Sequence, residues 1–201
     1  MTGREVRRER TTKETSVSCH LEVDGTGQVT VSTGLPFFDH MISQLGRHGG
    51  FDLDLTAHGD LAVDAHHTVE DVGIVLGETL HAALGDKAGV RRFASVAVPL
   101  DEALIEVALD LSGRPFLVYE VDPGAGGEAY PLGDPPFDPQ LAEEFWRAFC
   151  TSSAITLHMS MRSGRNAHHI LEASFKAVAR ALRDAVRVEG GGVPSTKGAL
   201  G

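Results

Sequence analysis

One short motif occurs twice in this chain, and the repetition limits the folds that the chain can adopt. Residues 66–70 read HHTVE, and residues 168–172, 102 positions later, read HHILE. Each copy opens a stretch with apolar residues at helical spacing, and similar strand and helix patterns precede both copies in the same order. A duplicated α/β unit of roughly 95 residues explains this order better than chance does. A single α/β domain with a coincidental order is the alternative.

Hydrophobic periodicity predicts strands, a helix, a further strand and a second helix in each half. In the first half, strands are expected within 4–23, chiefly at 15–23, and at 28–32 and 51–57, with helices at 37–47 and 66–84. In the second half, strands are expected at 96–98, 103–111, 116–121 and 155–161, with helices at 141–149 and 168–186. The Pro- and Gly-rich stretch 122–139 is expected to be a long loop. We place the first repeat at 1–93, the second at 94–188, and a Gly-rich tail, mobile unless a ligand orders it, at 189–201.

Composition and charge exclude several classes of function. The net charge of −10 argues against nucleic acid as a partner, because phosphate backbones are bound by basic patches. Two distant cysteines, Cys19 and Cys150, argue against a disulfide scaffold and favour a reducing compartment. The first fifteen residues are charged, unlike a signal peptide, and no apolar run approaches the ~20 residues of a membrane helix. We therefore expect a cytoplasmic protein with no membrane partner.

The doubled motif predicts metal binding. Residues four apart share one face of a helix, so His66 and Glu70 can reach one metal ion, and His168 and Glu172 another. Adjacent residues diverge by ~100° around the helix axis, so the two histidines of a pair are expected to bind different ions. The alternative is that the pairs are surface or capping features.

Two further histidines could complete such sites. His40 lies in the first expected helix, and His158 lies in the strand before the second motif. With them, eight side chains could form two sites of three imidazoles and one carboxylate each. This ligand set suits manganese, iron, nickel or zinc, and it does not choose among them.

Several strings in the sequence resemble the imidazoleglycerol-phosphate dehydratase family. In chain order they are 35–41 (LPFFDHM), 64–71 (DAHHTVED), 99–103 (PLDEA), 110–115 (DLSGRP), 164–172 (GRNAHHILE) and 194–198 (PSTKG). The resemblance implies an α+β fold, a tandem duplication of a unit similar to the second domain of ribosomal protein S5, with sheets and helices packed in two layers. It implies an enzyme of histidine biosynthesis, a hydro-lyase that converts imidazoleglycerol phosphate to imidazoleacetol phosphate and water.

The resemblance also implies a cofactor, partners and site residues. It implies two Mn²⁺ ions per active site and a homo-oligomer of 24 subunits, with metal sites completed between neighbours. The implied metal ligands are His40, His66, His67, Glu70, His158, His168, His169 and Glu172. The implied catalytic residues are Glu14 together with His40, His66, His67, Glu70, His168, His169 and Glu172. The implied substrate contacts are Glu14, His48, Arg92, Arg114, Ser195 and Lys197.

Without the resemblance, Glu14 would be an exposed strand residue, and Arg92 and Arg114 would be ordinary surface charges. The implied reaction assigns a chemical role to each of them. The hydrogen to be removed is weakly acidic, and metal ions on the substrate's imidazole would lower the pKa of that ring. A carboxylate outside the metal shells, Glu14, is free to act as a base. Guanidinium groups and Lys197 would hold the phosphate.

Two other functions fit part of the pattern. A di-metal hydrolase of phosphate esters would also place metals side by side, although such sites usually depend on aspartates and bridging carboxylates. A metal-storage or shell protein would bind metal without turnover, and it would need neither the arginines nor the segment 195–197. Phosphate release separates the first alternative from a dehydratase.

Overall fold

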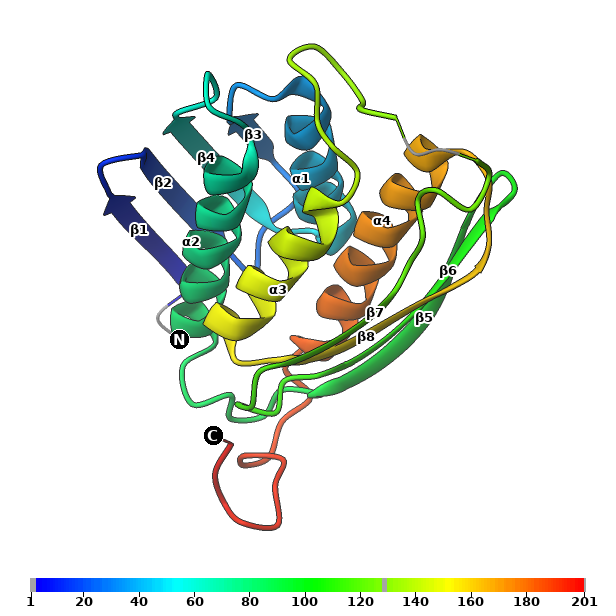
Figure 1. The fold of residues 1–201 in the computed structure, drawn as a ribbon. Coiled ribbons are helices and arrows are strands. Elements are labelled where there is room, and N and C mark those ends of the chain that lie inside the picture. The colour runs from blue at the N-terminus through cyan, green and yellow to red at the C-terminus, as the bar shows by residue number, and fades with distance from the viewer. Residues whose placement is uncertain (1–2, 128–129, 201) are drawn as a thin grey trace.

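The computed structural model describes residues 3–127 and 130–200, and its two halves contain the same series of elements (Figure 1). The strands are β1 (Glu5–Thr11), β2 (Thr15–Glu22), β3 (Val29–Ser32), β4 (Asp52–Gly59), β5 (Phe93–Leu100), β6 (Ala103–Asp110), β7 (Phe116–Glu120) and β8 (Thr156–Ser163). The helices are α1 (Pro36–Gly49), α2 (His66–Leu84), α3 (Leu141–Ser153) and α4 (Ala167–Ala185). The predicted α+β class and the duplication are confirmed.

The two sheets share one topology. Their strand orders are β1-β2-β4-β3 and β5-β6-β8-β7. In each sheet the first three strands are antiparallel, and the last strand pairs in parallel with its neighbour. Because parallel neighbours need a crossover, a helix joins the two parallel strands in both halves. The repeated order therefore reflects a repeated unit.

Each sheet buries one face only. In β2, Val17, Cys19 and Leu21 are buried, whereas the residues between them are more exposed. This alternation follows from the two-residue period of a strand. One face of each sheet thus packs on helices, and the other is an outer face.

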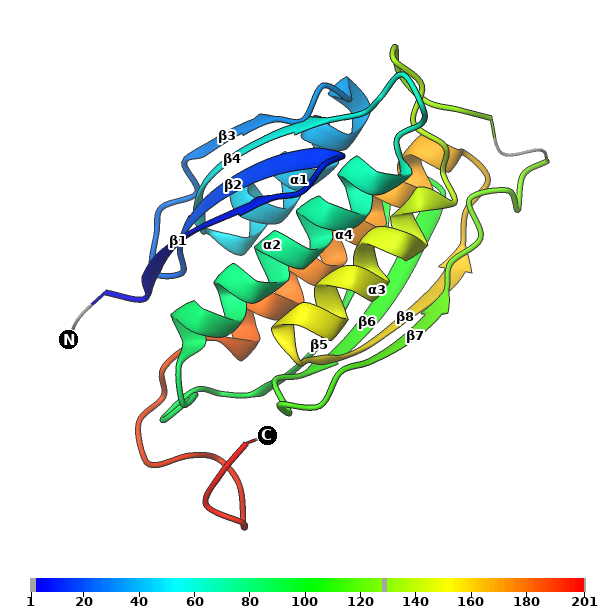
Figure 2. The same cartoon turned by 60° about the vertical axis from the view of Figure 1, so that its left-hand side comes forward.

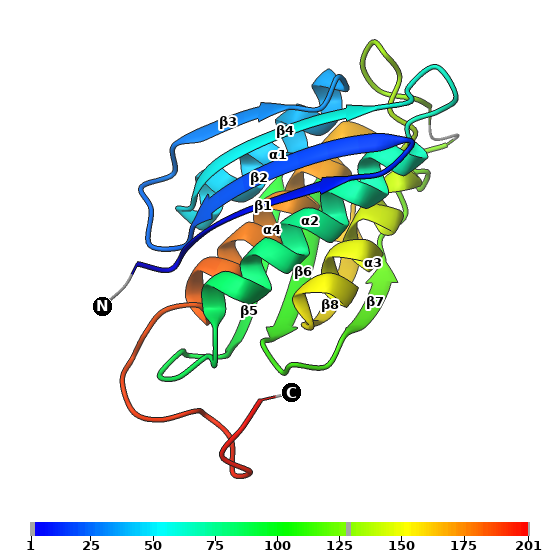
Figure 3. The ribbon, with the colours of Figure 1, turned by 90° about the vertical axis from the view of Figure 1, so that its left-hand side faces the viewer.

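Figures 2 and 3 show the helices as two middle layers between the two sheets. Helices α1 and α2 cover the first sheet, α3 and α4 cover the second, and α2 packs against α3 while α1 packs against α4. Gly73 and Gly77 allow the first of these helix pairs to approach closely, because a Cβ there would lie 2.8 Å and 2.7 Å from the carbonyl oxygens of Phe145 and Phe149. The main core therefore lies between the repeats as well as within them.

Three elements differ from the sequence-based expectation. β1 is a separate strand in antiparallel register with β2. β5 extends from Phe93 to Leu100, rather than over 96–98, because its ladder with β6 continues through Pro99 to the turn. α3 continues to Ser153, rather than ending at 149, because Cys150 and Ser153 remain buried and the Ser153 hydroxyl donates to the carbonyl of Phe149 (2.6 Å).

The loop and the tail both contact the body of the protein. In the predicted loop 122–139, of which residues 128–129 lie outside the described part, Phe137 is buried and stacks on Phe38 at 5.6 Å. The tail is bound to the segment after α2: the amide of Gly89 donates to the carbonyl of Gly192 (3.1 Å), and the amide of Glu189 donates to the carbonyl of Gly89 (2.8 Å).

Over the described residues, no helix is both long and apolar enough to span a membrane.

Candidate active site

Both histidine pairs lie in the first turn of a helix, and both helices begin at the same end of the molecule (Figure 1). Side chains before each pair fix the helix start. The Asn166 side chain accepts from the amides of His168 (2.9 Å) and His169 (3.3 Å), as an N-cap does. Asp64 accepts from the amide of His66 (2.6 Å).

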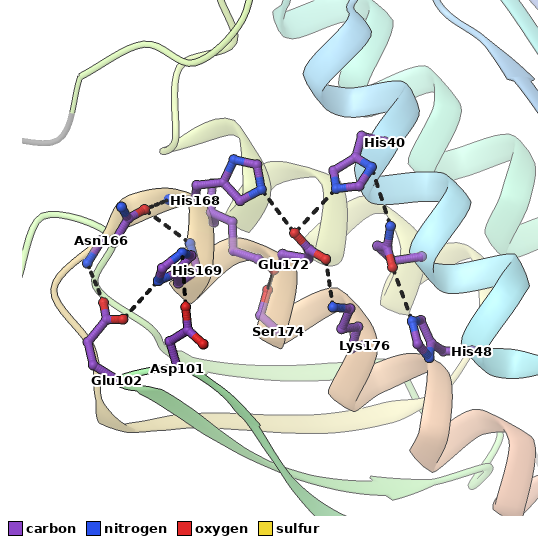
Figure 4. Close-up of polar contacts among 12 residues, drawn as sticks. His40, His48, Asp101, Glu102, Asn166, His168, His169, Glu172, Ser174 and Lys176 are labelled. Carbon is purple, nitrogen blue, oxygen red and sulfur yellow. Dashed lines mark hydrogen bonds and ion pairs between the residues drawn. The ribbon is translucent and has the colours of Figure 1, made fainter.

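Three of the eight predicted metal ligands meet around one point. His40 on α1 faces His168 and Glu172 on α4, as Figure 4 shows. Nε2 of His40 lies 3.2 Å from Oε2 of Glu172, and Nε2 of His168 lies 2.9 Å from the same oxygen. Their ligand atoms all lie within 4.8 Å of one another, and no other group of three or more possible ligands is so closely spaced among the described residues. Two imidazoles and a carboxylate are a donor set suited to a divalent transition metal.

The carboxyl group of Glu172 is held ionised. Its Oε1 accepts from Nζ of Lys176 at 2.6 Å, while Oε2 faces the two imidazoles (Figure 4). Partial burial alone would raise the pKa of Glu172, but Lys176, His40 and His168 outweigh burial and lower that pKa to about 2. At neutral pH this group is therefore a ready anionic ligand.

The second histidine of each pair is bound by a carboxylate at Nδ1. Nδ1 of His67 lies 3.0 Å from Asp60 and 3.9 Å from Glu14. The hydrogen bond to Asp60 raises the pKa of His67. Nδ1 of His169 lies 2.8 Å from Glu102, and this contact is the largest cause that lowers the pKa of Glu102 to about 2. A histidine held in this way presents Nε2 outward.

The other predicted ligands lie apart from the cluster within one chain. His66 lines a hollow of about 610 Å³ between residues 61–66 and 131–144, and Glu70 is half-buried on α2. His158 lies on the outer face of the second sheet, with its ring 6.3 Å from that of Phe116. His158 therefore does not approach the second motif of its own chain, and its role as a metal ligand stays a prediction. Leu157 and Met159 face the helices, so strand alternation turns His158 away from them.

A glutamine joins two of the predicted site residues. Nε2 of Gln44 lies 3.3 Å from Nδ1 of His40, and its Oε1 lies 3.1 Å from Nε2 of His48. Burial, followed by the positive charges of Lys176 and Arg180, lowers the pKa of His48. His48 is therefore neutral at pH 7 and donates to the glutamine oxygen.

The predicted phosphate-binding residues fall into two kinds. Arg92 is already engaged, because it forms a fork with Asp110 (2.7 and 3.1 Å) and donates to the carbonyl of Pro194 (2.7 Å). It thereby holds the tail that carries Ser195 and Lys197. Arg114 is exposed. Among the described residues, the one hydrogen bond of its side chain runs from Nη1 to the carbonyl oxygen of Ser112, at 3.5 Å.

Four residues that contact side chains of the predicted ligands were not predicted from the sequence. These residues are Gln44, Asp60, Glu102 and Lys176. Helical spacing could have found two of them, because Gln44 lies four residues after His40 and Lys176 four after Glu172. Asp60 and Glu102 lie in loops, and only the tertiary structure brings them to His67 and His169.

Comparison with known proteins identifies the family. The family model of imidazoleglycerol-phosphate dehydratase (IGPD) matches residues 33–182. The chain is 58% identical to the imidazoleglycerol-phosphate dehydratase of Acidothermus cellulolyticus over 193 residues, 96% of this chain and 91% of that protein.

Solved structures agree with this assignment. The crystal structure of IGPD from Pyrococcus furiosus, in complex with (S)-C348, matches with a TM-score of 0.81 at 35% identity, over 96% of this chain and 100% of that one. The Staphylococcus aureus enzyme matches with a TM-score of 0.75 at 32% identity, over 91% and 99%. The sequence, the fold and the site thus lead to one conclusion: this chain belongs to the imidazoleglycerol-phosphate dehydratase family, a family of hydro-lyases of histidine biosynthesis.

Proposed function

We propose that this protein removes water from imidazoleglycerol phosphate to give imidazoleacetol phosphate, and that it needs two Mn²⁺ ions per active site to do so. The observation that carries the proposal is the cluster of His40, His168 and Glu172, which the two repeats build together from α1 and α4. Family membership supports the substrate.

The residues present fit a divalent metal. In the cluster, two imidazole nitrogens and one ionised carboxylate face a common point, and Gln44 contacts the far side of one ring. The other predicted ligands, His66, His67, Glu70, His158 and His169, would complete this site and form a second one. When bound, the metal ions would lower the pKa of the substrate's imidazole and orient it.

Glu14 is the residue to which we assign proton transfer. It lies at the β1–β2 turn, its side chain is 58% exposed, and its Oε2 lies 3.9 Å from Nδ1 of His67. It is thus close to a predicted ligand and remains outside the shell of ligands. A carboxylate in that position can take the proton from the carbon next to the one that loses its hydroxyl group.

The phosphate of the substrate would be held by Arg114, Ser195 and Lys197. The amide of Lys197 already donates to the Ser195 hydroxyl (3.2 Å), which keeps this segment compact. Arg92 would contribute mainly by anchoring the tail through Pro194. Binding energy from the phosphate would orient the reacting end of the substrate.

Neighbouring subunits would complete the site, in an assembly of 24 copies. His158 cannot reach the cluster of its own chain, because it lies on the outer face of the second sheet. That face exposes Phe93 (55%) and Phe116 (60%), apolar surface of a kind that subunit contacts cover. We therefore assign His158 to a site that it shares with a neighbour.

The test is an assay for the enolised ketone product by ultraviolet absorbance, with and without Mn²⁺. We expect chelation to abolish turnover and Mn²⁺ to restore it. Turnover that persists in the chelated enzyme would overturn the metal requirement. Phosphate release without ketone formation would favour the phosphoesterase alternative instead.

Arg114→Ala provides a second test of the substrate. Loss of a guanidinium from a phosphate clamp should raise KM for imidazoleglycerol phosphate and leave Mn²⁺ binding unchanged. Arg147→Ala, an exposed arginine on α3 that pairs with Glu143, is the matched control. An unchanged KM for Arg114→Ala would remove this residue from the clamp.

A further inference from the structure

The duplication places one hairpin turn beside the second histidine of each pair. The turn between β1 and β2 carries Glu14, and the corresponding turn between β5 and β6 carries Glu102. Glu14 and Glu102 thus occupy corresponding places in the two repeats. Their surroundings differ, and the difference has a chemical consequence.

In the second repeat, the turn carboxylate is fully engaged. Glu102 accepts from the backbone amide of Asn166 (2.8 Å) and contacts Nδ1 of His169 at 2.8 Å (Figure 4). It also accepts from the backbone amide of Arg165 at 3.2 Å. Asp101 lies 3.8 Å from Nε2 of the same ring, which is beyond hydrogen-bonding distance. Glu102 therefore fixes both the start of α4 and the ring of His169.

In the first repeat, a different carboxylate contacts the corresponding ring. Asp60, which directly follows β4, approaches Nδ1 of His67 at 3.0 and 3.3 Å. The turn carboxylate, Glu14, stays at 3.9 Å. The ring of His67 is the partner in every side-chain hydrogen bond and ion pair of Asp60 among the described residues.

We propose that Asp60 and Glu102 are positioning residues that hold His67 and His169 by Nδ1, so that Nε2 of each ring is left to bind a divalent cation. Asp60 thereby takes over in the first repeat what Glu102 does in the second, and Glu14 is released for proton transfer. Outer carboxylates of this kind fix the tautomer and the orientation of a ligating imidazole. This inference rests on the proposed metal-dependent function.

The test measures Mn²⁺ affinity and stoichiometry by electron paramagnetic resonance, without substrate. We expect Asp60→Asn and Glu102→Gln each to weaken Mn²⁺ binding about 10- to 100-fold. Glu14→Gln should bind Mn²⁺ as wild type does while losing turnover. Glu78→Gln, an exposed residue on α2 at 4.0 Å from Arg8, is the control for loss of a carboxylate.

The outcomes separate this inference from the proposed function. If the wild type binds Mn²⁺ and both Asp60→Asn and Glu102→Gln bind it equally well, the positioning role is overturned and the function stands. If only Glu14→Gln weakens binding, the division of roles is reversed and the proposal fails. If the wild type turns over without binding Mn²⁺, both are overturned. Glu102 also accepts from two backbone amides at the start of α4, so Glu102→Gln could destabilise the fold. If that variant does not fold, Asp60→Asn decides the test.

Discussion

At the scale of single residues, the hydrogen bond between Gln44 and His40 bears on metal binding. In the structure its amide nitrogen faces Nδ1 of His40 (3.3 Å), which places the proton of that ring on Nε2, next to Glu172. A metal on Nε2 would move the proton to Nδ1, which then needs an acceptor. Gln44→Leu should therefore weaken Mn²⁺ binding about tenfold.

The matched variant is Gln44→Glu, which keeps an acceptor for Nδ1–H and should retain most of the Mn²⁺ affinity. Isothermal titration of the metal-free protein with Mn²⁺ measures both variants. Equal affinities for the leucine and glutamate variants would show that the hydrogen bond to His40 has no part in metal binding.

The ion pair between Asp24 and Arg4 should make the stability of the fold depend on pH. Arg4 forms a fork with Asp24 and also donates to the carbonyl of Val186 (2.6 Å), at the end of α4. Arg4 lowers the pKa of Asp24 below 3.8, so the pair stabilises the fold above that pH and loses its effect as the carboxyl is protonated at lower pH. Asp24→Asn should cost up to about 1 kcal/mol at pH 7, because the pair is partly exposed.

Urea unfolding at pH 7 and at pH 3 measures this effect. The difference in the free energy of unfolding between wild type and Asp24→Asn should shrink at pH 3. A difference that grows on acidification would contradict the assigned pairing.

At the scale of elements, the β1–β2 turn is fastened to α2 by a buried contact. The Thr15 hydroxyl donates to Asp71, which also pairs with Arg10 at 2.5 Å, and the Thr12 hydroxyl accepts from the amides of Glu14 and Thr15. These bonds fix the place of Glu14 relative to the helix that begins with His66. Thr15→Val should therefore lower kcat about tenfold through misplacement of Glu14, with KM and Mn²⁺ affinity little changed.

Thr15→Ser, which keeps the hydroxyl, should restore turnover. Thr15→Val should also cost about 1–3 kcal/mol in the free energy of unfolding, because buried Asp71 loses a partner. Steady-state kinetics together with urea unfolding separate the two effects. If the serine and valine variants lose kcat equally, the hydroxyl does not position Glu14.

The sequence predicts an element well where contacts between residues close in the chain determine its bounds. The starts of α2 and α4 could be predicted, because motif and periodicity coincide there. The outward direction of His158 also follows from the sequence, because the apolar residues Leu157 and Met159 on either side of it face the core. The full length of β5 depends on pairing with β6, and the approach of Asp60 to His67 depends on loop packing, so neither follows from spacing alone.

For the whole molecule, the position of His158 bears on the proposal that neighbouring chains share an active site. The cluster of His40, His168 and Glu172 belongs to α1 and α4, between the two sheets, whereas His158 lies on an outer face. If both parts belong to one active site, they must come from different chains. Closed symmetric assemblies can bring one surface of a chain against a different surface of a neighbouring copy in this way.

Co-expression of two inactive variants tests this arrangement. His158→Ala and His168→Ala should each be inactive alone. In a mixed assembly, a His168→Ala subunit supplies an intact outer face and a His158→Ala subunit supplies an intact cluster. When subunits mix at random, about a quarter of the sites combine the two. Differently tagged copies, purified as hybrids and supplied with Mn²⁺, should therefore regain activity. His40→Ala with His168→Ala is the control, because both lesions affect the cluster that one chain builds and no combination repairs it. If the first pair regains no more activity than the second, His158 acts within its own chain or not at all, and the shared site must be abandoned.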